Sequence, residues 1–293
     1  MDTERIRSLI REAQADLVRI RRDLHAHPEL GYQEQRTSGV VQAELKRLGI
    51  EHVAGVAGGT GVVAHLPATD AAAVRPAVGL RADMDALPIV EATGVAHAST
   101  NEGVMHACGH DGHTTMLLGA ARVLSAMAHR PNPVTFLFQP AEEGGAGGER
   151  MCQDGAMEGR IIGPKVGRVF GLHGWPDISV GHVASRPGPL LAAVDTFDVT
   201  LRGVGGHAAY PHYTVDPVIA ACHCVTALQT IASRNTDPLD PIVVSVTGGQ
   251  AGSADNVIPN SARFFGTVRT HDEGVRKHAR ERFHAIVPQF AAA

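Results

Sequence analysis

The chain has 293 residues, of which 44% are hydrophobic and only 4% aromatic. This length suits one large domain or two smaller ones, with cores built mainly from aliphatic side chains. The formal net charge of −4 is small and no basic block stands out, which argues against nucleic acid as the main partner.

The first part of the chain alternates between helical and strand patterns. Apolar residues at helical spacing predict an amphipathic helix over residues 6–27 and a second helix over residues 37–48, which Gly49 ends. The other elements expected in this part are strands over 61–66, 77–81, 134–138 and 166–172 and a helix over 113–128. Strands that alternate with helices predict a layered α/β domain.

The pattern changes near residue 186, in an Arg-Pro-Gly-Pro segment. The elements expected after it are strands over 196–201, 242–247 and 262–270 and helices over 216–233 and 273–287. The first of these helices begins with Asp216-Pro217, a favourable capping pair. This order predicts a small α+β sandwich, so we expect two domains, 1–185 and 186–293.

The N-terminal segment is charged throughout and lacks the apolar centre of a signal peptide. No run of about 18 apolar residues occurs, so we expect no membrane span. The four cysteines, at positions 108, 152, 222 and 224, are too sparse to imply a disulfide framework. We therefore expect a cytoplasmic protein.

A metal site is indicated by residues 106–113, which contain a thiol, three imidazoles and a carboxylate. Cys108 and His110 are the predicted ligands, because thiolate sulfur and imidazole nitrogen suit zinc, manganese, cobalt or nickel. Asp111 and His113 are expected to support the ligands, and His106 is not expected to bind metal. The alternative is a free buried cysteine with surface histidines nearby.

Two further candidates each follow a strand pattern. Adjacent Glu142 and Glu143 face opposite ways on an extended chain, so one carboxylate can bind metal while the other acts as a general base. His173 ends an apolar strand, where α/β sheets place their ligands. The alternatives are a solvated acidic turn and a structural histidine.

Asp83 and Asp85 follow the strand over 77–81, and either one is placed to orient a histidine ligand. They also fit a turn at a strand end. In the second domain, His207 follows three glycines and can stabilise a developing oxyanion. Asn256 and Arg269 suit a carbonyl and a carboxylate, and the alternatives are an asparagine in a turn and an ordinary arginine on an edge strand.

Two other patterns carry less weight. Residues 203–206 resemble a dinucleotide-binding loop, but the third glycine is missing and the context is wrong. The sequence Cys222-His223-Cys224 lies inside a predicted helix, which splays the three groups around its axis. We expect neither a nucleotide site nor a second metal site there.

As a set, these residues resemble the amidohydrolase branch of the aminoacylase/carboxypeptidase-type metallopeptidases, which includes hippurate hydrolases and indole-acetyl-amino-acid hydrolases. The matching stretches span nearly the whole chain in the family's order, at residues 22–30, 81–88, 106–113, 139–144, 171–173, 205–209 and 256–259. The resemblance implies a catalytic domain with a two-metal site, into which a lid domain that often dimerises is inserted.

The resemblance also implies residue roles. The implied metal ligands are Cys108, His110, Glu143 and His173. Glu142 would be the general base, His207 and Asn256 would stabilise the tetrahedral intermediate, and Arg269 would hold the substrate carboxylate. In the family, a last histidine ligand follows the lid, whereas this chain ends before such a residue.

The sequence therefore predicts metal-dependent hydrolysis of a small N-acyl amino acid. In this hypothesis the metals polarise the amide carbonyl and lower the pKa of bound water, and Glu142 transfers the proton. The alternative is an inactive, truncated fragment that only binds a ligand or partner. The acyl group, the amino acid and the metal are left open.

Overall fold

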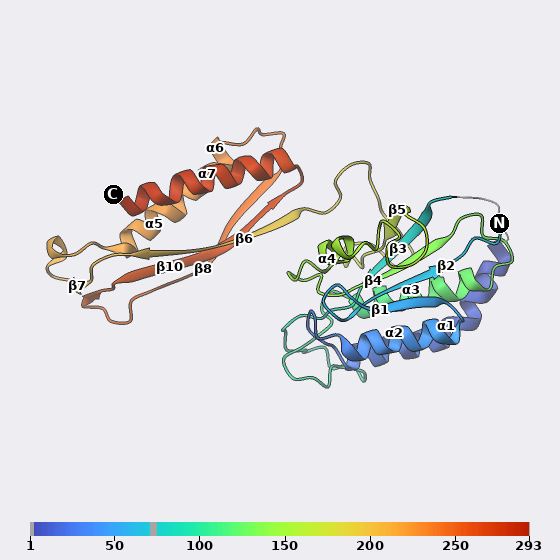
Figure 1. Cartoon of the computed structure of the whole chain (residues 1–293). Helices are drawn as coiled ribbons and strands as arrows, with labels where there is room; N and C mark the ends of the chain where they lie inside the picture. The colour runs from blue at the N-terminus through green and yellow to red at the C-terminus, as the bar shows by residue number, and fades with distance from the viewer. Residues whose placement is uncertain (1–2, 71–74, 293) are drawn as a thin grey trace. The chain divides into compact units, whose positions relative to one another are not determined.

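The computed structural model describes residues 3–70 and 75–292. The chain divides into two compact units, called here the N-terminal unit, up to Asp177, and the C-terminal unit, from Ile178 onward. In Figure 1 the first runs from blue to yellow-green and the second from yellow to red. The division lies before the boundary expected at residue 186, and residues 178–192 form no helix or strand.

A mixed five-stranded sheet forms the centre of the N-terminal unit, in the order β1-β2-β4-β3-β5 (Figure 1). Its strands are β1 (Glu51–Val56), β2 (Gly61–Leu66), β3 (Ala77–Asp83), β4 (Val134–Gln139) and β5 (Val166–Gly171). β3 runs parallel to both β4 and β5, whereas β2 is antiparallel to β1 and β4. The carboxyl ends of β3, β4 and β5 therefore lie at the same edge, where α/β sheets bind their ligands.

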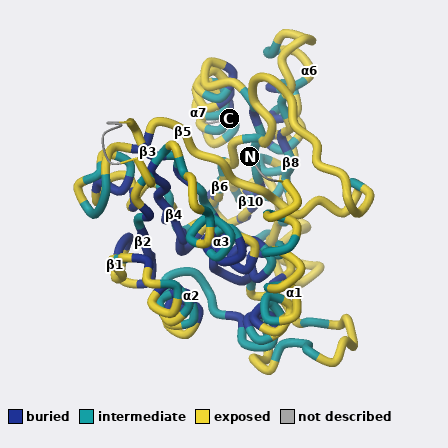
Figure 2. The backbone as a smooth tube through the Cα atoms, turned by 90° about the vertical axis from the view of Figure 1, so that its right-hand side faces the viewer, coloured by how far each residue is buried: buried dark blue, intermediate teal, exposed yellow. Residues whose placement is uncertain are grey.

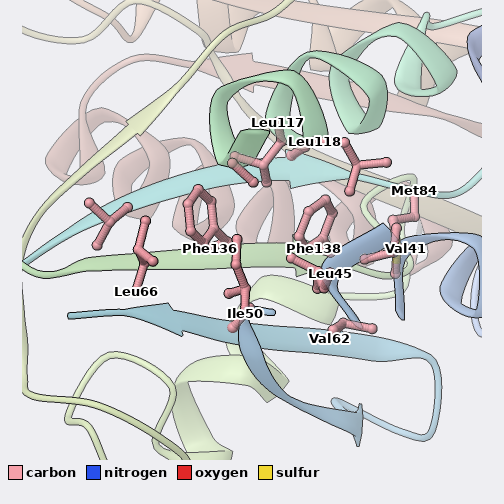
Figure 3. Close-up of a cluster of buried hydrophobic side chains, with 14 of the residues drawn as sticks. Val41, Leu45, Ile50, Val62, Leu66, Met84, Leu117, Leu118, Phe136 and Phe138 are labelled. Carbon is pink, nitrogen blue, oxygen red and sulfur yellow. The ribbon is translucent and has the colours of Figure 1, made fainter. Parts of the chain in front are cut away.

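Helices cover both faces of this sheet. They are α1 (Thr3–Ala26), α2 (Gln35–Arg47), α3 (His110–Ser125) and α4 (Gly147–Asp154). Phe136 and Phe138 of β4 point to the face that packs against Leu118 of α3 and the apolar sides of α1 and α2 (Figure 3). Leu137, between them, packs on the opposite face with Met151 of α4. The alternation of side chains along β4 thus fixes α3 against the sheet.

Burial is uneven across the sheet. β4 is buried along its whole length, whereas only the first residue of β5 is buried (Figure 2). Phe170 and Leu172 are more than half exposed. β4 is a central strand with neighbours on both sides and helices above and below, while β5 is an edge strand. None of the described helices is long and apolar enough to cross a membrane.

The C-terminal unit is a two-layer α+β structure, as the sequence predicts. Its strands are β6 (Ala193–Arg202), β7 (Gly206–His207), β8 (Ile242–Ala251), β9 (Val257–Ile258) and β10 (Ser261–Thr270). Its helices are the short 3₁₀ helix η1 (Pro211–Tyr213), α5 (Pro217–Leu228), α6 (Thr230–Arg234) and α7 (Glu273–Ala292). α5 and α7 pack on the antiparallel sheet β6-β10-β8 through a core that includes Leu228 and Phe264.

Several boundaries differ from those expected. The helix expected over 216–233 is two helices, α5 and α6, which meet at Gln229. Its predicted start is confirmed, because Asp216 accepts hydrogen bonds from the backbone N–H groups of Val218 and Ile219. α7 continues past Pro288 instead of ending at 287, because Phe290 still packs on the core of this unit.

Two elements were not expected from the sequence. β1 lacks a clear alternation, since four of its six residues are exposed at the sheet edge. α4 has only eight residues and begins with two glycines, which have low helix propensity. Both elements depend on tertiary packing rather than on local sequence preference. Residue periodicity does not reveal such packing.

One partly buried arginine joins the three helices on the α3 face of the sheet. Arg122 of α3 donates to Asp16 of α1 at 2.5 Å and to Glu44 of α2 at 2.6 Å. Hydrogen bonds from Arg19 and then Arg122 hold the pKa of Asp16 below its ordinary value. Burial raises the pKa of Glu44, but hydrogen bonds from Arg47 and Arg122 outweigh it, so that pKa is also lowered.

We expect Arg122→Met to reduce the free energy of unfolding by about 1–3 kcal/mol at neutral pH, because two carboxylates lose a charged donor. Both carboxylates have lowered pKa values in the folded state, so this contribution is present above about pH 4.5 and is lost as the pH falls further. Urea denaturation should therefore show the difference from the wild type shrinking towards about pH 3. A difference that stays constant with pH would contradict this account. Arg47→Met, which removes a more exposed donor from Glu44 alone, should show a smaller difference.

Candidate metal centre

The N-terminus of α3 presents the two predicted ligands of residues 106–113. Gly109, which caps this helix, has φ +83°, a left-handed conformation that favours glycine. This turn separates Cys108, which precedes it, from His110, which opens the helix. α3 thus begins three residues earlier than the sequence pattern indicates.

His110 is 1% exposed and its two ring nitrogens have different surroundings. Nδ1 lies 2.8 Å from the backbone carbonyl oxygen of Asp85, which can only accept a hydrogen bond. In the neutral ring the proton therefore lies on Nδ1, which leaves the lone pair of Nε2 free. Nε2 is buried and has no hydrogen-bond partner within the described chain. A buried acceptor in this state is the arrangement expected of a metal ligand.

Potential metal ligands gather around His110. Three groups of donor atoms lie within 4.8 Å of one another, and all three share this histidine: Cys108, His110 and His173; His110, Glu142 and Glu143; Asp83, His110 and His113. Cys108 Sγ is 3.4 Å from His173 Nε2, and His110 Nε2 is 3.9 Å from a carboxylate oxygen of each glutamate. Ligands of one tetrahedral zinc ion lie about 3.3–3.8 Å apart, so these spacings are close to those of a metal site.

His113 is held in place by both ring nitrogens and is therefore not free to bind metal. Nδ1 is 2.6 Å from Asp83 Oδ1, and Nε2 accepts a hydrogen bond from the backbone N–H of Gly174 at 2.8 Å. His113 thus ties the segment that carries His173 to the end of β3. A supporting role for His113 stays a prediction, and these contacts are compatible with it.

The two aspartates after β3 contact different parts of the cluster. Asp83 bonds to His113 and to Arg81 Nη1 at 2.6 Å. Its burial raises the pKa, but the hydrogen bond with His113 and the nearby charges outweigh this and lower it to about 2. Asp85 lies 3.3 Å from His110 Nδ1 and accepts the backbone N–H of Glu143 at 2.9 Å. The structure therefore places both where they can orient predicted ligands.

Asp111 does not contact any predicted ligand, although the sequence suggests a supporting role for it. Its carboxylate lies 2.8 Å from Arg21 Nε and 2.9 Å from His25 Nδ1, both on α1. Adjacent residues of a helix face different sides, so Asp111 points to α1 while His110 points to the cluster. These contacts join the start of α3 to α1.

The electrostatics of the cluster favour a cation. Burial, and next a hydrogen bond and the charge of Glu143, raise the pKa of Cys108 to about 12. Burial and then the charge of Glu143 also raise the pKa of Glu142. Carboxylates thus lie close to the thiol and to one another, and a bound cation would offset this repulsion. Together with the free His110 Nε2, this shows that the residues present fit a divalent metal.

In the C-terminal unit, two of the three predicted substrate contacts lie together. β7 and β9 pair His207 with Val257, and the backbone N–H of Ala208 donates to the Asn256 carbonyl at 3.0 Å. Arg269 lies near the opposite end of β10 from this β7–β9 pair. Arg269 is eight positions along the extended strand from Ser261, a distance of about 26 Å. Within this unit, Arg269 and His207 do not form one pocket.

The segment at 203–206 does not resemble a nucleotide-binding loop in its structure. It leads into β7 and then the three-residue helix η1, rather than into a long helix whose N-terminus could bind phosphate. Cys222 is exposed and Cys224 buried on α5, and neither belongs to a donor group of the described residues.

Glu34 was not predicted as a functional residue, yet it positions the segment of Glu142 and Glu143. It is fully buried and accepts hydrogen bonds from the backbone N–H of Ala141 at 2.8 Å and from Thr60 Oγ1 at 2.6 Å. A single glutamate without a motif gives no signal in one sequence.

Comparison with known proteins identifies the family. The model of "Peptidase family M20/M25/M40" matches residues 79–292. The chain is 45% identical over 278 residues to "N-acetyl-L-cysteine deacetylase" of Bacillus subtilis (strain 168), which covers 94% of this chain and 64% of that protein. It is 46% identical over 254 residues to "IAA-amino acid hydrolase ILR1-like 2" of Arabidopsis thaliana. This match covers 86% of this chain and 55% of that protein.

Solved structures show the same similarity. A crystal structure of a Staphylococcus aureus protein superposes with a TM-score of 0.88 at 32% identity, covering 99% of this chain and 75% of that one. The Bacillus subtilis YXEP protein is described as a dinuclear metal binding peptidase from the M20 family. It superposes with a TM-score of 0.75 at 35% identity, covering 96% of this chain and 71% of that one. The family model, the relatives and these structures agree: the chain belongs to peptidase family M20/M25/M40.

Proposed function

We propose that the protein is a metal-dependent amidohydrolase that cleaves small N-acyl amino acids. The observation that carries the proposal is that two groups of donor atoms share His110, one with Cys108 and His173 and the other with Glu142 and Glu143. Relatives named for deacetylase and amino acid hydrolase activity support it. The chain spans 64%, 55% and 60% of the length of the first three relatives, so the activity of the whole protein is inferred from those proteins.

The four proposed ligands would hold two divalent ions, which supply Lewis acidity that polarises an amide carbonyl and acidifies water. Sulfur and imidazole ligands together suit zinc, manganese, cobalt or nickel. Two observations support His110 as the central ligand: its free, buried Nε2 and its membership of all three donor groups. Asp83 and Asp85 would orient the ligands through His113 and His110.

Glu142 is the proposed general base and Glu143 the proposed ligand. Asp85 fixes the backbone of Glu143, and the side chain of Glu143 contacts Cys108, which suits a ligand. The Glu142 side chain is the more exposed of the two, at 41% against 28%, so it can face a substrate. Its carboxylate would take a proton from water and pass it to the leaving amine nitrogen. A raised pKa strengthens it as a base.

The C-terminal unit is proposed to act as a lid that also mediates dimer formation. In this scheme His207 and Asn256 stabilise the tetrahedral intermediate, and Arg269 binds the substrate carboxylate. A guanidinium group suits a carboxylate because it offers two parallel N–H donors. The sparse cysteines support a reducing, cytoplasmic location, since all four are free in the structure.

Glu142→Gln tests the general base. The variant should keep its metal, because Glu142 is not one of the four proposed ligands. Its turnover of N-benzoylglycine should fall about 10²–10⁴-fold, because the amide cannot accept the proton. Steady-state kinetics beside elemental analysis provide the measurement, and normal turnover by this variant would refute the assignment.

His110→Ala tests the metal centre itself. Elemental analysis of the purified protein should show that most of the metal is lost, because every donor group contains this histidine. His106→Ala is a matched control: His106 is also buried, at 4% exposure against 1%, but belongs to no donor group among the described residues. Equal metal content in the two variants would contradict the proposal. If the purified wild-type protein contains no metal, the result would favour the alternative hypothesis, an inactive fragment that only binds a ligand or partner.

Metal binding should release a proton from Cys108. The pKa of about 12 keeps this thiol protonated near pH 7, whereas a metal ligand must be a thiolate. Adding zinc to metal-free protein in weak buffer should therefore acidify the solution, and the apparent affinity should rise with pH. Cys108→Ser should release about one proton fewer than the wild type. Cys152→Ser, at an exposed cysteine outside the cluster, should behave as the wild type.

A further inference from the structure

A long loop, residues 88–104, runs from the segment of Asp85 to that of Cys108 without forming a helix or strand. Its two ends meet, because Leu87 and Met105 pair as an isolated antiparallel bridge. We propose that Glu91 and His25 are positioning residues of the metal centre, which clamp this loop to the first turn of α3 and so couple the position of the loop to metal affinity. The inference rests on the proposed metal centre.

His25 of α1 lies between two carboxylates from different segments. Its Nδ1 is 2.9 Å from Asp111 Oδ2, and its Nε2 is 3.2 Å from Glu91 Oε1. The three side chains are 6%, 0% and 4% exposed, so water does not separate them. An ionised carboxylate can only accept hydrogen bonds, and a ring that donates from both nitrogens satisfies both contacts. Hydrogen bonds to buried charged groups are among the stronger ones in proteins.

Glu91 also holds the loop together from within. Its second carboxylate oxygen accepts the backbone N–H of Ser99 at 2.6 Å, and the hydroxyl of Thr93 donates to its first. The bond from Ser99, and next that from Thr93, lower the pKa of Glu91 to about 2. The carboxylate is therefore ionised at neutral pH. One side chain thus joins the two halves of the loop and presents a fixed negative charge to His25.

The other end of the clamp reaches the metal centre through the start of α3. Asp111 follows His110 directly in the first helical turn, and it also accepts a bond from Arg21 Nε at 2.8 Å. A change in the contact between His25 and Asp111 therefore acts on the turn that presents His110. Neither His25 nor Glu91 belongs to a donor group of the described residues, so both would act only by positioning. Hydrogen-bonded partners behind metal ligands tune the affinity of the ligands for metal.

Coupling of this kind is reciprocal. If the position of the loop raises the affinity for metal, then bound metal must also stabilise the loop in that position. Zinc should therefore slow hydrogen exchange in residues 88–104, although no residue of the loop is a proposed ligand. A purely structural role of Glu91 predicts no such effect of zinc. This difference separates positioning from general stabilisation.

Glu91→Gln tests the clamp, with Glu102→Gln, at an exposed position of the same loop, as the matched control. Glutamine has the same shape, but its amide group places a donor against the N–H of either His25 or Ser99. The zinc dissociation constant is measured by competition with a coloured chelator, and hydrogen exchange is measured with and without zinc. His25→Gln breaks the clamp from α1 and leaves the bonds within the loop, in case Glu91→Gln does not fold.

Zinc binding should weaken about 3- to 30-fold in Glu91→Gln and His25→Gln and stay unchanged in Glu102→Gln. Zinc should slow exchange of the loop in the wild type and in Glu102→Gln but not in the two clamp variants.

Unchanged zinc binding in both clamp variants, or a zinc effect on exchange that persists in them, would overturn the inference and leave the proposed function standing. The expected coupling in a protein that hydrolyses no N-acyl amino acid would support the clamp while counting against the proposed function. A wild type that binds no zinc would overturn both the clamp and the metal centre.

Discussion

The hydrogen bond from His110 Nδ1 to the carbonyl oxygen of Asp85 is the interaction on which the site depends. It joins the first turn of α3 to the segment that follows β3. Since the carbonyl only accepts, the bond also selects the tautomer whose Nε2 can bind a cation. Without it the ring could turn, and the three donor groups would lose the one residue that they share. A backbone contact thereby sets the chemistry of a side chain.

The sheet explains why residues far apart in the sequence meet at this histidine. β3, β4 and β5 are parallel neighbours, so the segments with Asp85, Glu143 and His173 leave the sheet at one edge. The buried side chains of β4 hold α3 over that edge, which brings Cys108 and His110 to the same place. The rigid core therefore positions groups that are themselves partly exposed. A rigid core that holds partly exposed side chains suits a site that a substrate must reach.

Much of this arrangement could be predicted because it follows from short-range patterns. The ligand candidates stand at the ends of apolar strands or in one dense motif, so Cys108, His110 and His173 could be named from the sequence. What the sequence did not reveal depends on long-range contacts. The bond between Glu34 and Ala141, the partners of Asp111 on α1 and the elements β1 and α4 arise only when distant segments pack. The separation of His207 from Arg269 likewise follows from strand length and pairing.

The central claim is that Cys108 and the imidazoles bind one metal centre, and X-ray absorption spectroscopy of the zinc-loaded protein tests it most directly. The account predicts a sulfur neighbour at about 2.3 Å from zinc together with nitrogen or oxygen neighbours at about 2.0–2.2 Å. The sulfur signal should disappear in Cys108→Ser. A spectrum that contains only nitrogen and oxygen neighbours in the wild type, or a sulfur signal that persists in Cys108→Ser, would contradict the account.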